Sequence, residues 1–494
     1  MAKTRRLAPL ACALLTVTVT VTVTVVGCGG SSAPEPPHGG AVLRLALPLL
    51  PNTLDPAKVA DLPSLNVAHE LNAGLTRFSG RGVEPDLAES WDVSDGGLVW
   101  TFHLRKGLRW SDDAPITAED FRRSWLRALK PSTRSAYARA EMQNIRGARR
   151  FRVTGSGDVG VEAPDDRTLR VTLQHPVPWL DEQVAWPVFF PVRESGSATS
   201  GPFRLASRST SRLVLERNFN YWNVGAVKPK QLVFTTSNDG VDGVLPRGVL
   251  APGFPWIPTT AQSSAGRALP TLSRGLLWLV TRGTPLADPQ ARRLVQGSVR
   301  GISTSAAGWV PPAMPGAATI APPGLETTVF SPQPLKLTLA YTKQDPTAAG
   351  FASELQNVLG KDGVDLTLNE VPTLAELVRL AGPPAQPGID MVLLGWSSEF
   401  FDQYNILDLF PCASAFNVAR WCDRSYDRLM HRAVRELDDQ ARYRIERVLV
   451  QKLEDEVPAI PLRAPAERVQ LKAGVSGFRW SPIGFYELMG MTRS

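Results

Sequence analysis

The 494-residue chain contains few of the residues on which enzymes most often rely. It has four cysteines and five histidines, and the histidines are scattered along the chain. Neither a G-x-S-x-G nucleophile elbow nor an H-E-x-x-H zinc motif occurs. His69 precedes Glu70 but has no second histidine at the required offset, so we interpret it as an ordinary helix-surface residue. These absences make a secreted hydrolase the weakest alternative, and we predict no metal and no cofactor.

The chain also lacks a concentrated charge of one sign. Lys and Arg number 54 and Asp and Glu 47, a formal net charge of +7. Removing Lys3, Arg5 and Arg6 with an N-terminal signal would leave 51 basic residues against 47 acidic ones. A nucleic-acid partner requires a concentrated basic face, so we expect none. The length exceeds what one hydrophobic core usually organises, and two or three domains are expected.

The N-terminus has the layout of a bacterial lipoprotein signal. Three basic residues precede an apolar run from Leu7 to Val26, and the run ends in V-V-G-C at Cys28. Small residues directly before a cysteine resemble a lipobox, where the signal is cut and a lipid is attached to the thiol. An uncleaved membrane anchor is the alternative, because twenty residues are long enough to span, but alternating Thr and Val makes a poor helix. We predict a signal peptide over 1–27, lipidation of Cys28 and a flexible tether over 28–40.

The stretch from Val83 to Leu129 predicts a hairpin, a turn and a capped helix. Residues Leu98 to Leu104 alternate between two faces, the period of a half-buried strand. Thr117 stands three residues before Asp120 in a capping-box pattern, and Pro131 ends the predicted helix. Apolar residues at four-residue spacing share one helical face between these limits: Phe121, Trp125 and Leu129.

This stretch resembles the signature of the family 5 extracellular solute-binding proteins, the dipeptide- and oligopeptide-binding subunits of ABC importers. Asp113 stands where the family prefers Gly, and Asp tolerates the left-handed turn conformation. Other matches follow in order along the chain and become thin over 239–273. The signature residues are Pro85-Asp86-Leu87-Ala88, Trp91, Trp100-Thr101-Phe102, Leu104-Arg105, Pro115 and Ala118-Glu119-Asp120.

The resemblance implies an α/β, two-lobed type II periplasmic-binding-protein fold with an extra N-terminal subdomain. We assign 41–66, 186–272 and 463–494 to lobe I, 67–185 to the extra subdomain and 273–462 to lobe II. Periodicity alone predicts strands alternating with helices from Leu335 to Trp396, which indicates βαβ units around a parallel sheet. Ligands of such sheets bind beyond the carboxyl ends of the strands, which directs attention to the residues after Trp396.

The stretch from Trp396 to Phe410 resembles the family segment in which an acid three places after the Trp pairs with the amino group of a bound peptide. Here that acid is Glu399. A buried ammonium requires a fixed carboxylate, because its desolvation is otherwise costly. Asp402 offers a second carboxylate, and Trp396 either stacks on the ligand or closes the core. The alternative for Glu399 is a solvated loop acid.

Cys412 and Cys422 flank a segment that resembles the dipeptide binders, in which the two cysteines form a disulfide. An extracytoplasmic compartment permits such a bond, and a ten-residue spacing is unlike that of zinc ligands. Cys12 would leave with the signal and Cys28 would carry the lipid, so no odd thiol remains.

The resemblance therefore implies a monomeric lipoprotein on the extracytoplasmic face of the cell membrane. It would capture peptides by hinge closure and deliver them to an ABC permease without enzymatic chemistry. The main alternative keeps the fold but makes the protein a sensor or a carrier of another solute, such as a metal chelate, a sugar or an antibiotic precursor. Glu399 in place of Asp and the thin match over 239–273 leave that alternative open.

Overall fold

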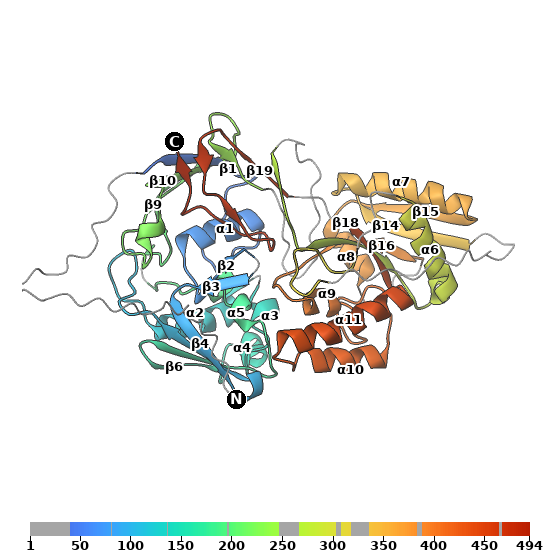
Figure 1. Cartoon of the computed structure of the whole chain (residues 1–494), viewed down its shortest axis with the longest axis horizontal. Helices are drawn as coiled ribbons and strands as arrows, with labels where there is room; N and C mark the ends of the chain where they lie inside the picture. Colours follow the sequence, from blue (N-terminus) through green and yellow to red (C-terminus); the bar gives the residue numbers. More distant parts are fainter. Residues whose placement is uncertain are drawn as a thin grey trace, which may run out of the picture.

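The structure is a computed structural model that describes residues 40–80, 82–135, 137–194, 197–246, 266–302, 308–317, 335–382, 388–463 and 467–494. The predicted signal peptide, Cys28 and all of the predicted tether except Gly40 lie outside these residues. In Figure 1 the described residues form two bodies side by side, one built from both ends of the chain and one from its later middle part. No helix within the described ranges is long and apolar enough to cross a membrane.

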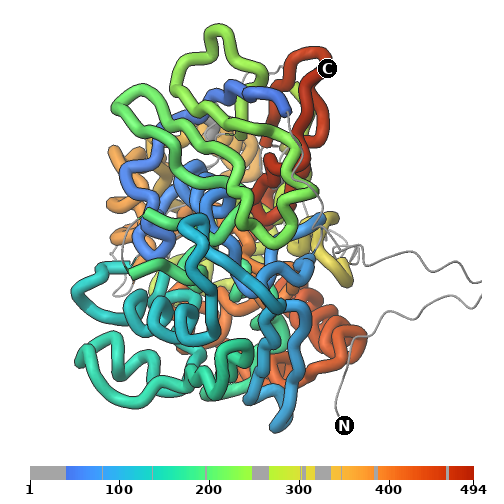
Figure 2. Tube along the Cα trace, turned by 90° about the vertical axis from the view of Figure 1, so that its left-hand side faces the viewer, coloured from blue at the N-terminus to red at the C-terminus, as the bar shows by residue number. Residues whose placement is uncertain are grey.

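Lobe I is built on a seven-stranded sheet in which both ends of the chain meet. β1 (Val42–Ala46) runs parallel to β10 (Gln231–Thr235) and to the short β11 (Gly243–Val244), and β11 pairs with β19 (Glu467–Leu471). Figure 2 shows this meeting of the N-terminal and C-terminal segments. The remaining strands complete the sheet toward its two edges: β8 (Phe203–Arg208), β9 (Arg212–Arg217) and β12 (Arg267–Leu269).

Helix α1 (Leu62–Leu71) is buried along almost its whole length in lobe I. The carboxylate of Asp61 caps it by accepting a hydrogen bond from the Ser64 N–H at 2.9 Å, and the helix begins at Leu62. The proposed boundary between residues 66 and 67 falls inside this helix. His69 packs 4.9 Å from the ring of Phe190 and 4.3 Å from that of Phe485. Its interpretation as a helix-surface residue was therefore wrong.

The extra subdomain contains a four-stranded antiparallel sheet and the helix that the capping box predicted. In β5 (Val99–Leu104) alternate residues are buried, which confirms the predicted strand. The Thr117 N–H donates to the Asp120 carboxylate at 2.8 Å, and α2 (Ala118–Leu129) ends where expected. Asp113 has φ of 70°, the left-handed conformation for which Gly is preferred. The other elements are β4 (Ala88–Ser94), β6 (Val161–Asp165), β7 (Thr168–Thr172), α3 (Ala138–Glu141), α4 (Ala148–Thr154) and α5 (Leu180–Gln183).

Lobe II has a mixed sheet covered by helices. β14 (Leu335–Thr342) is parallel to β15 (Val364–Val371) and β16 (Met391–Leu393), which confirms the predicted parallel pairing. β13 (Ser273–Leu279), however, runs antiparallel to all three of its partners in this sheet, so the sheet is mixed. The other elements are α6 (Pro289–Gly301), α7 (Pro346–Lys361), α8 (Leu374–Ala381), β17 (Trp396–Ser397), α9 (Tyr404–Leu407), α10 (Arg424–Ala433), α11 (Asp439–Glu456) and β18 (Ala459–Arg463).

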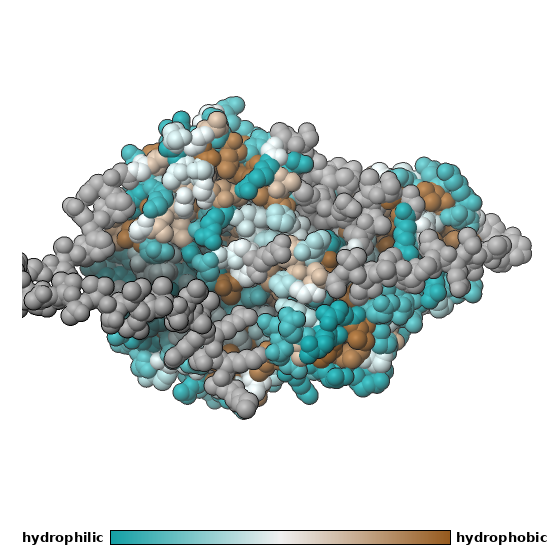
Figure 3. Space-filling view, in the orientation of Figure 1, coloured by the Kyte–Doolittle hydropathy of each residue, from teal (hydrophilic) through white to brown (hydrophobic). Residues whose placement is uncertain are grey.

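The hydrophobic core is divided among three clusters of buried side chains. One cluster fills lobe I and the extra subdomain, and two lie on opposite faces of the lobe II sheet. Phe400 and Phe401 belong to the first cluster although they come from the lobe II segment. The face shown in Figure 3 is mostly hydrophilic with a hydrophobic patch over the α10–α11 pair, where Val448 is 49% exposed. The two lobes are thus joined by apolar contacts that the loop after β17 supplies.

Candidate functional site

The loop over residues 398–404, which we call the bridging loop, follows β17 and reaches from lobe II into the first cluster. The Phe400 ring stacks on the Trp179 ring with centroids 4.5 Å apart and an interplanar angle of 5°. The Tyr404 ring lies 4.7 Å from the same indole. Offset aromatic pairs of this kind contribute about 0.5–1.5 kcal/mol beyond their buried area. The bridging loop is therefore held against the extra subdomain by stacking.

Two hydrogen bonds fix the backbone of the bridging loop to the opposite side. The indole N–H of Trp186 donates to the Glu399 carbonyl oxygen at 2.8 Å. The Phe401 N–H donates to the Glu182 carboxyl group. Burial raises the pKa of Glu182 well above its ordinary value. These bonds orient the loop so that the Glu399 side chain faces the extra subdomain.

The Glu399 carboxyl group meets a second carboxyl group there, that of Glu141. Glu141 donates a hydrogen bond to Glu399, so the pair requires a shared proton. Burial raises the pKa of Glu399 from 4.5 to about 7. Burial and the neighbouring Glu399 charge raise the pKa of Glu141 well above its ordinary value. At neutral pH the proton therefore resides mainly on Glu141.

Polar groups without partners surround this carboxyl pair. Gln183 donates to Glu141 at 3.4 Å, but its own amide oxygen has no partner. The Tyr137 hydroxyl, in a residue 4% exposed, also has none. Burial, followed by the charges of Glu399, Glu141 and Asp61, raises the pKa of Tyr137 well above its ordinary value. In the described part of the chain neither carboxyl group of the pair has a Lys or Arg partner.

This arrangement is chemically suited to a cation. Two buried carboxyl groups cannot both ionise without a compensating positive charge, and a proton supplies it here. An ammonium group from a solute would supply the same positive charge. It has N–H donors and no acceptor, so it could donate hydrogen bonds to both carboxyl groups. Tyr137 and Gln183 would provide further polar contacts.

Asp402 belongs to the bridging loop itself, but its partner is Arg442 and not the carboxyl pair. Its carboxylate accepts two hydrogen bonds from Arg442, at 2.7 and 2.8 Å, and one from the Tyr404 N–H at 2.8 Å. Asp402 is 2% exposed. Arg442 also donates to the Glu436 carbonyl oxygen at 2.9 Å. Asp402 therefore connects the loop to the start of α11.

Trp396 begins the segment and is only partly buried. Its indole N–H donates to the Asn405 side chain at 2.6 Å, and its ring lies 5.4 Å from that of Phe416. It packs against one of the two lobe II clusters. These contacts brace the two ends of the bridging loop against each other.

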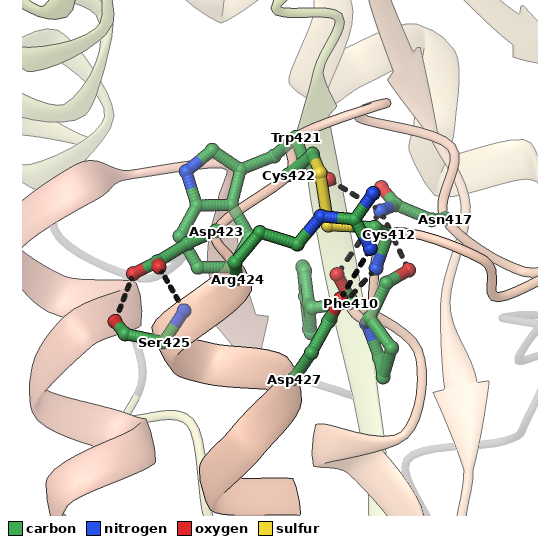
Figure 4. The surroundings of a disulfide bond; sticks show 10 residues. Phe410, Cys412, Asn417, Trp421, Cys422, Asp423, Arg424, Ser425 and Asp427 are labelled. Atoms are coloured by element: carbon green, nitrogen blue, oxygen red, sulfur yellow. Dashed lines mark hydrogen bonds and ion pairs between the residues drawn. A yellow bond between two sulfur atoms is a disulfide. The ribbon is translucent and has the colours of Figure 1, made fainter.

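Cys412 and Cys422 form the disulfide that the resemblance implied, with their Cα atoms 4.5 Å apart (Figure 4). Asp423 next to it caps α10 and accepts from Lys452 at 2.8 Å. Although burial raises the pKa of Asp423, hydrogen bonds from Lys452 and Ser425 lower it to about 2. The Asn417 amide closes the loop by donating to three carbonyl groups, those of Phe410, Pro411 and Trp421.

Sequence reasoning did not find the partners of the bridging loop. Glu141, Trp179, Glu182 and Trp186 lie more than 200 residues before it in the chain, and the Trp186–Glu399 hydrogen bond spans 213 positions. A run rich in tryptophan and phenylalanine from 179 to 190 was the only local signal. No group of three or more His, Cys, Asp or Glu side chains that could hold a metal ion occurs among the described residues.

Comparisons with known proteins identify relatives along nearly the whole chain. Residues 82–417 match the bacterial extracellular solute-binding proteins, family 5, middle region. The chain is 29% identical to the probable deoxycholate-binding periplasmic protein YgiS of Escherichia coli, over 87% of this chain and 89% of that protein. It is 26% identical to the oligopeptide-binding protein OppA of Bacillus subtilis, over 86% and 87%.

Solved structures share the fold. The unliganded open form of MppA, a periplasmic murein tripeptide binding protein of Escherichia coli, superposes with a TM-score of 0.76 at 22% identity, covering 92% of this chain and 99% of that one. The predicted two-lobed α/β fold is confirmed by this likeness.

Proposed function

The chain belongs to family 5 of the bacterial extracellular solute-binding proteins, and from this premise we propose that it captures peptides outside the cytoplasm and delivers them to an ABC permease. The names of the Bacillus subtilis and murein-tripeptide relatives support a peptide ligand. The observation that carries the proposal is the Glu141–Glu399 pair, because it offers two carboxyl groups of raised pKa with no Lys or Arg partner among the residues that the structure describes.

Capture follows from exchanging a proton for an ammonium group. When the lobes separate, the bridging loop leaves Trp179 and the two glutamates become hydrated. A peptide enters with its amino terminus toward Glu399, and closure places the ammonium where the shared proton was. The free energy that desolvation costs the carboxylates is offset by the ion pair formed. Main-chain hydrogen bonds hold the rest of the peptide, so affinity does not depend on its side chains.

The three predicted ligand residues take different parts in this proposal. Glu399 binds the ammonium directly. Trp396 stacks on the ligand or braces the loop, and Asp402 acts through the loop that Arg442 anchors. The lipid on Cys28 keeps the protein at the membrane near its permease, and the protein works as a monomer.

A second candidate ligand is an amphipathic steroid acid, since the 29% identical relative is named as a deoxycholate binder. The aromatic surface of Trp179 and Phe400 suits such a ligand. The acid pair disfavours it, because a ligand carboxylate would be repelled by Glu399. Peptides with a free amino terminus therefore remain the better candidate.

Calorimetry with trialanine, N-acetyl-trialanine and deoxycholate tests both candidates. We expect trialanine to bind and its acetylated form to fail, because acetylation removes the charge. Glu399→Ala is expected to weaken trialanine binding at least about tenfold, or 1.4 kcal/mol. Glu376→Ala is the matched control, since Glu376 lies on α8 of lobe II with its side chain 39% accessible. Unchanged affinity in Glu399→Ala would remove this residue from the site, and binding of deoxycholate alone would contradict the peptide function.

A further inference from the structure

A cavity outside the bridging loop lies between residues assigned to lobe I and residues assigned to the extra subdomain. It has a volume of about 230 Å³ and lies between α1, the hairpin of β2 (Thr76–Ser79) and β3 (Gly82–Pro85), and the C-terminal segment. That segment carries β21 (Arg479–Trp480) and β22 (Tyr486–Glu487). None of the lining residues comes from the segment assigned to lobe II. Phe78 in its wall lies 6.5 Å from the Phe401 ring of the bridging loop, so the cavity is next to that loop but does not include it.

Five residues that line the cavity carry a buried polar atom with no hydrogen-bond partner. Such atoms are rare in native proteins, and each costs about 1–3 kcal/mol when left unpaired. Because these unpartnered atoms gather around one cavity, we infer that a polar molecule in the cavity forms hydrogen bonds with them. The atoms are His69 Nε2, Glu70 Oε2, Arg77 Nε, Ser481 Oγ and the Tyr486 hydroxyl oxygen.

The charged side chains around the cavity already have partners within the protein. Arg77 pairs with Glu84 at 3.0 Å and with Glu487 at 3.4 Å. Arg479 pairs with the same two carboxylates, at 3.6 and 3.5 Å. Asp86 accepts hydrogen bonds from a tyrosine and a tryptophan of lobe I. Each charged side chain that the structure describes in the cavity lining therefore has an ion-pair or hydrogen-bond partner.

The unpartnered groups themselves are uncharged at neutral pH apart from the paired arginine. Burial raises the pKa of Glu70 to about 8, and its Oε1 atom accepts from the Leu488 N–H at 2.8 Å. The protonated Oε2 is then a donor. Burial lowers the pKa of His69 to about 3, so its ring is neutral. With Ser481 and Tyr486 hydroxyl groups nearby, the cavity offers both donors and acceptors without net charge.

Aromatic walls complete the site. The Phe78 and Phe485 rings stack with centroids 4.8 Å apart and an interplanar angle of 10°, and both line the cavity. Trp480 and Tyr221 also line it. At about 30 Å³ for each water, the volume corresponds to roughly eight water molecules, which a six-membered sugar ring with its hydroxyl groups would displace. The ring C–H groups would pack on the aromatic walls while the hydroxyls meet the polar atoms.

We propose that this cavity binds an uncharged polyhydroxylated molecule of monosaccharide size. The ligand is a free sugar or the terminal sugar of a glycan, since the two present the same hydroxyl groups. The site is additional to the peptide site and independent of Glu399.

Saturation-transfer NMR on the full chain with D-glucose, D-galactose and N-acetyl-D-glucosamine, each also as its β-1,4-linked disaccharide, tests the proposal. We expect transfer to at least one of these probes. Binding of a disaccharide alone would identify the end of a glycan as the source. Tyr486→Phe and Ser481→Ala each remove one unpartnered hydroxyl, so they are expected to leave thermal stability unchanged or raised and to weaken sugar binding about tenfold.

Two further variants separate this site from the peptide site. Glu70→Gln keeps an uncharged donor and the acceptor for Leu488, so it is expected to retain sugar binding. Glu399→Ala is expected to lose peptide affinity and to keep its sugar binding. Tyr486→Phe is expected to lose sugar binding and to keep its peptide affinity. Absence of transfer from every probe, or sugar binding that survives both Tyr486→Phe and Ser481→Ala, would overturn the proposal and leave the cavity to ordered water.

Discussion

Closure of the unliganded protein should depend on pH through the carboxyl pair of the bridging loop. When the lobes are apart, Glu141 and Glu399 are hydrated and have ordinary pKa values near 4.5. In the structure, where the bridging loop stacks on Trp179 and which we call the closed form, burial raises the pKa of Glu399 to about 7 and that of Glu141 well above its ordinary value. The closed form therefore binds more protons than the open form between these values. Linkage requires that closure becomes less favourable as pH rises through this window.

The size of the effect follows from the shift. The pKa of Glu399 rises from 4.5 to about 7 on closure, and each pKa unit corresponds to about 1.4 kcal/mol. Glu399 alone therefore adds roughly 3 kcal/mol to the free energy of closure at pH 8. That is on the order of a hundredfold in the ratio of open to closed molecules. Because the Glu399 residue keeps part of its area accessible, this is an upper figure. The cost is absent below pH 4.5, where both forms are protonated.

Small-angle X-ray scattering of the unliganded protein from pH 5 to pH 8 measures this shift as an increase in the radius of gyration. Glu141→Gln with Glu399→Gln carries no titrating proton, so its scattering should stay nearly constant. Glu182 adds a further step, because burial also raises its pKa, and Glu182→Gln should remove it. Circular dichroism at each pH controls for unfolding. The reasoning would be refuted if the radius of gyration of the wild type did not change with pH, or if that of the double variant changed as much as the wild type's.

Three other variants address stability. Asp402→Asn should lower the free energy of unfolding by about 3 kcal/mol in urea titrations, because Arg442 loses its buried partner. Asp439→Asn removes an exposed partner of Arg442 and should lower the free energy of unfolding by less than about 1 kcal/mol. Equal losses in the two variants would contradict this prediction. The double variant Cys412→Ser, Cys422→Ser should lower the free energy of unfolding by about 2–3 kcal/mol, the loop entropy for a ten-residue separation. Reductant should lower the melting temperature of the wild type but not that of the double variant, and a fall in both would point to another cause. Asp113→Gly should stabilise by up to about 1 kcal/mol, because φ of 70° strains any residue with a Cβ atom; a lower melting temperature would show that the Asp side chain matters more.

Local features of the fold were predictable because they depend on neighbouring residues. The alternation in β5, the capping box of Thr117 and the left-handed Asp113 each follow from interactions within a few positions. The parallel pairing of β14 with β15 followed from the period of the segments. The domain boundaries stay a prediction, and α1 continues through one of them.

The candidate site was predictable on one side only. The sequence indicates Glu399 as an acid on a loop, but the second acid comes from a short helix in another part of the chain, and no periodicity connects them. Asp402 illustrates the same limit, because its partner Arg442 lies forty positions later on α11. His69 was misjudged because the residues that enclose it, Phe190 and Phe485, are distant in sequence. Charge and residue type alone do not say whether a side chain ends in water or beneath another segment.

The placement of β19 in lobe I has a consequence for synthesis. β11 lies between β1 and β19, and β12 is attached to the sheet through β19. A nascent chain that has left the ribosome only as far as residue 463 already contains every strand of the lobe II sheet, while β12 still has no neighbour. The lobe that is begun first is therefore finished last, and its open strand edge must be kept from pairing with other chains until the final residues arrive.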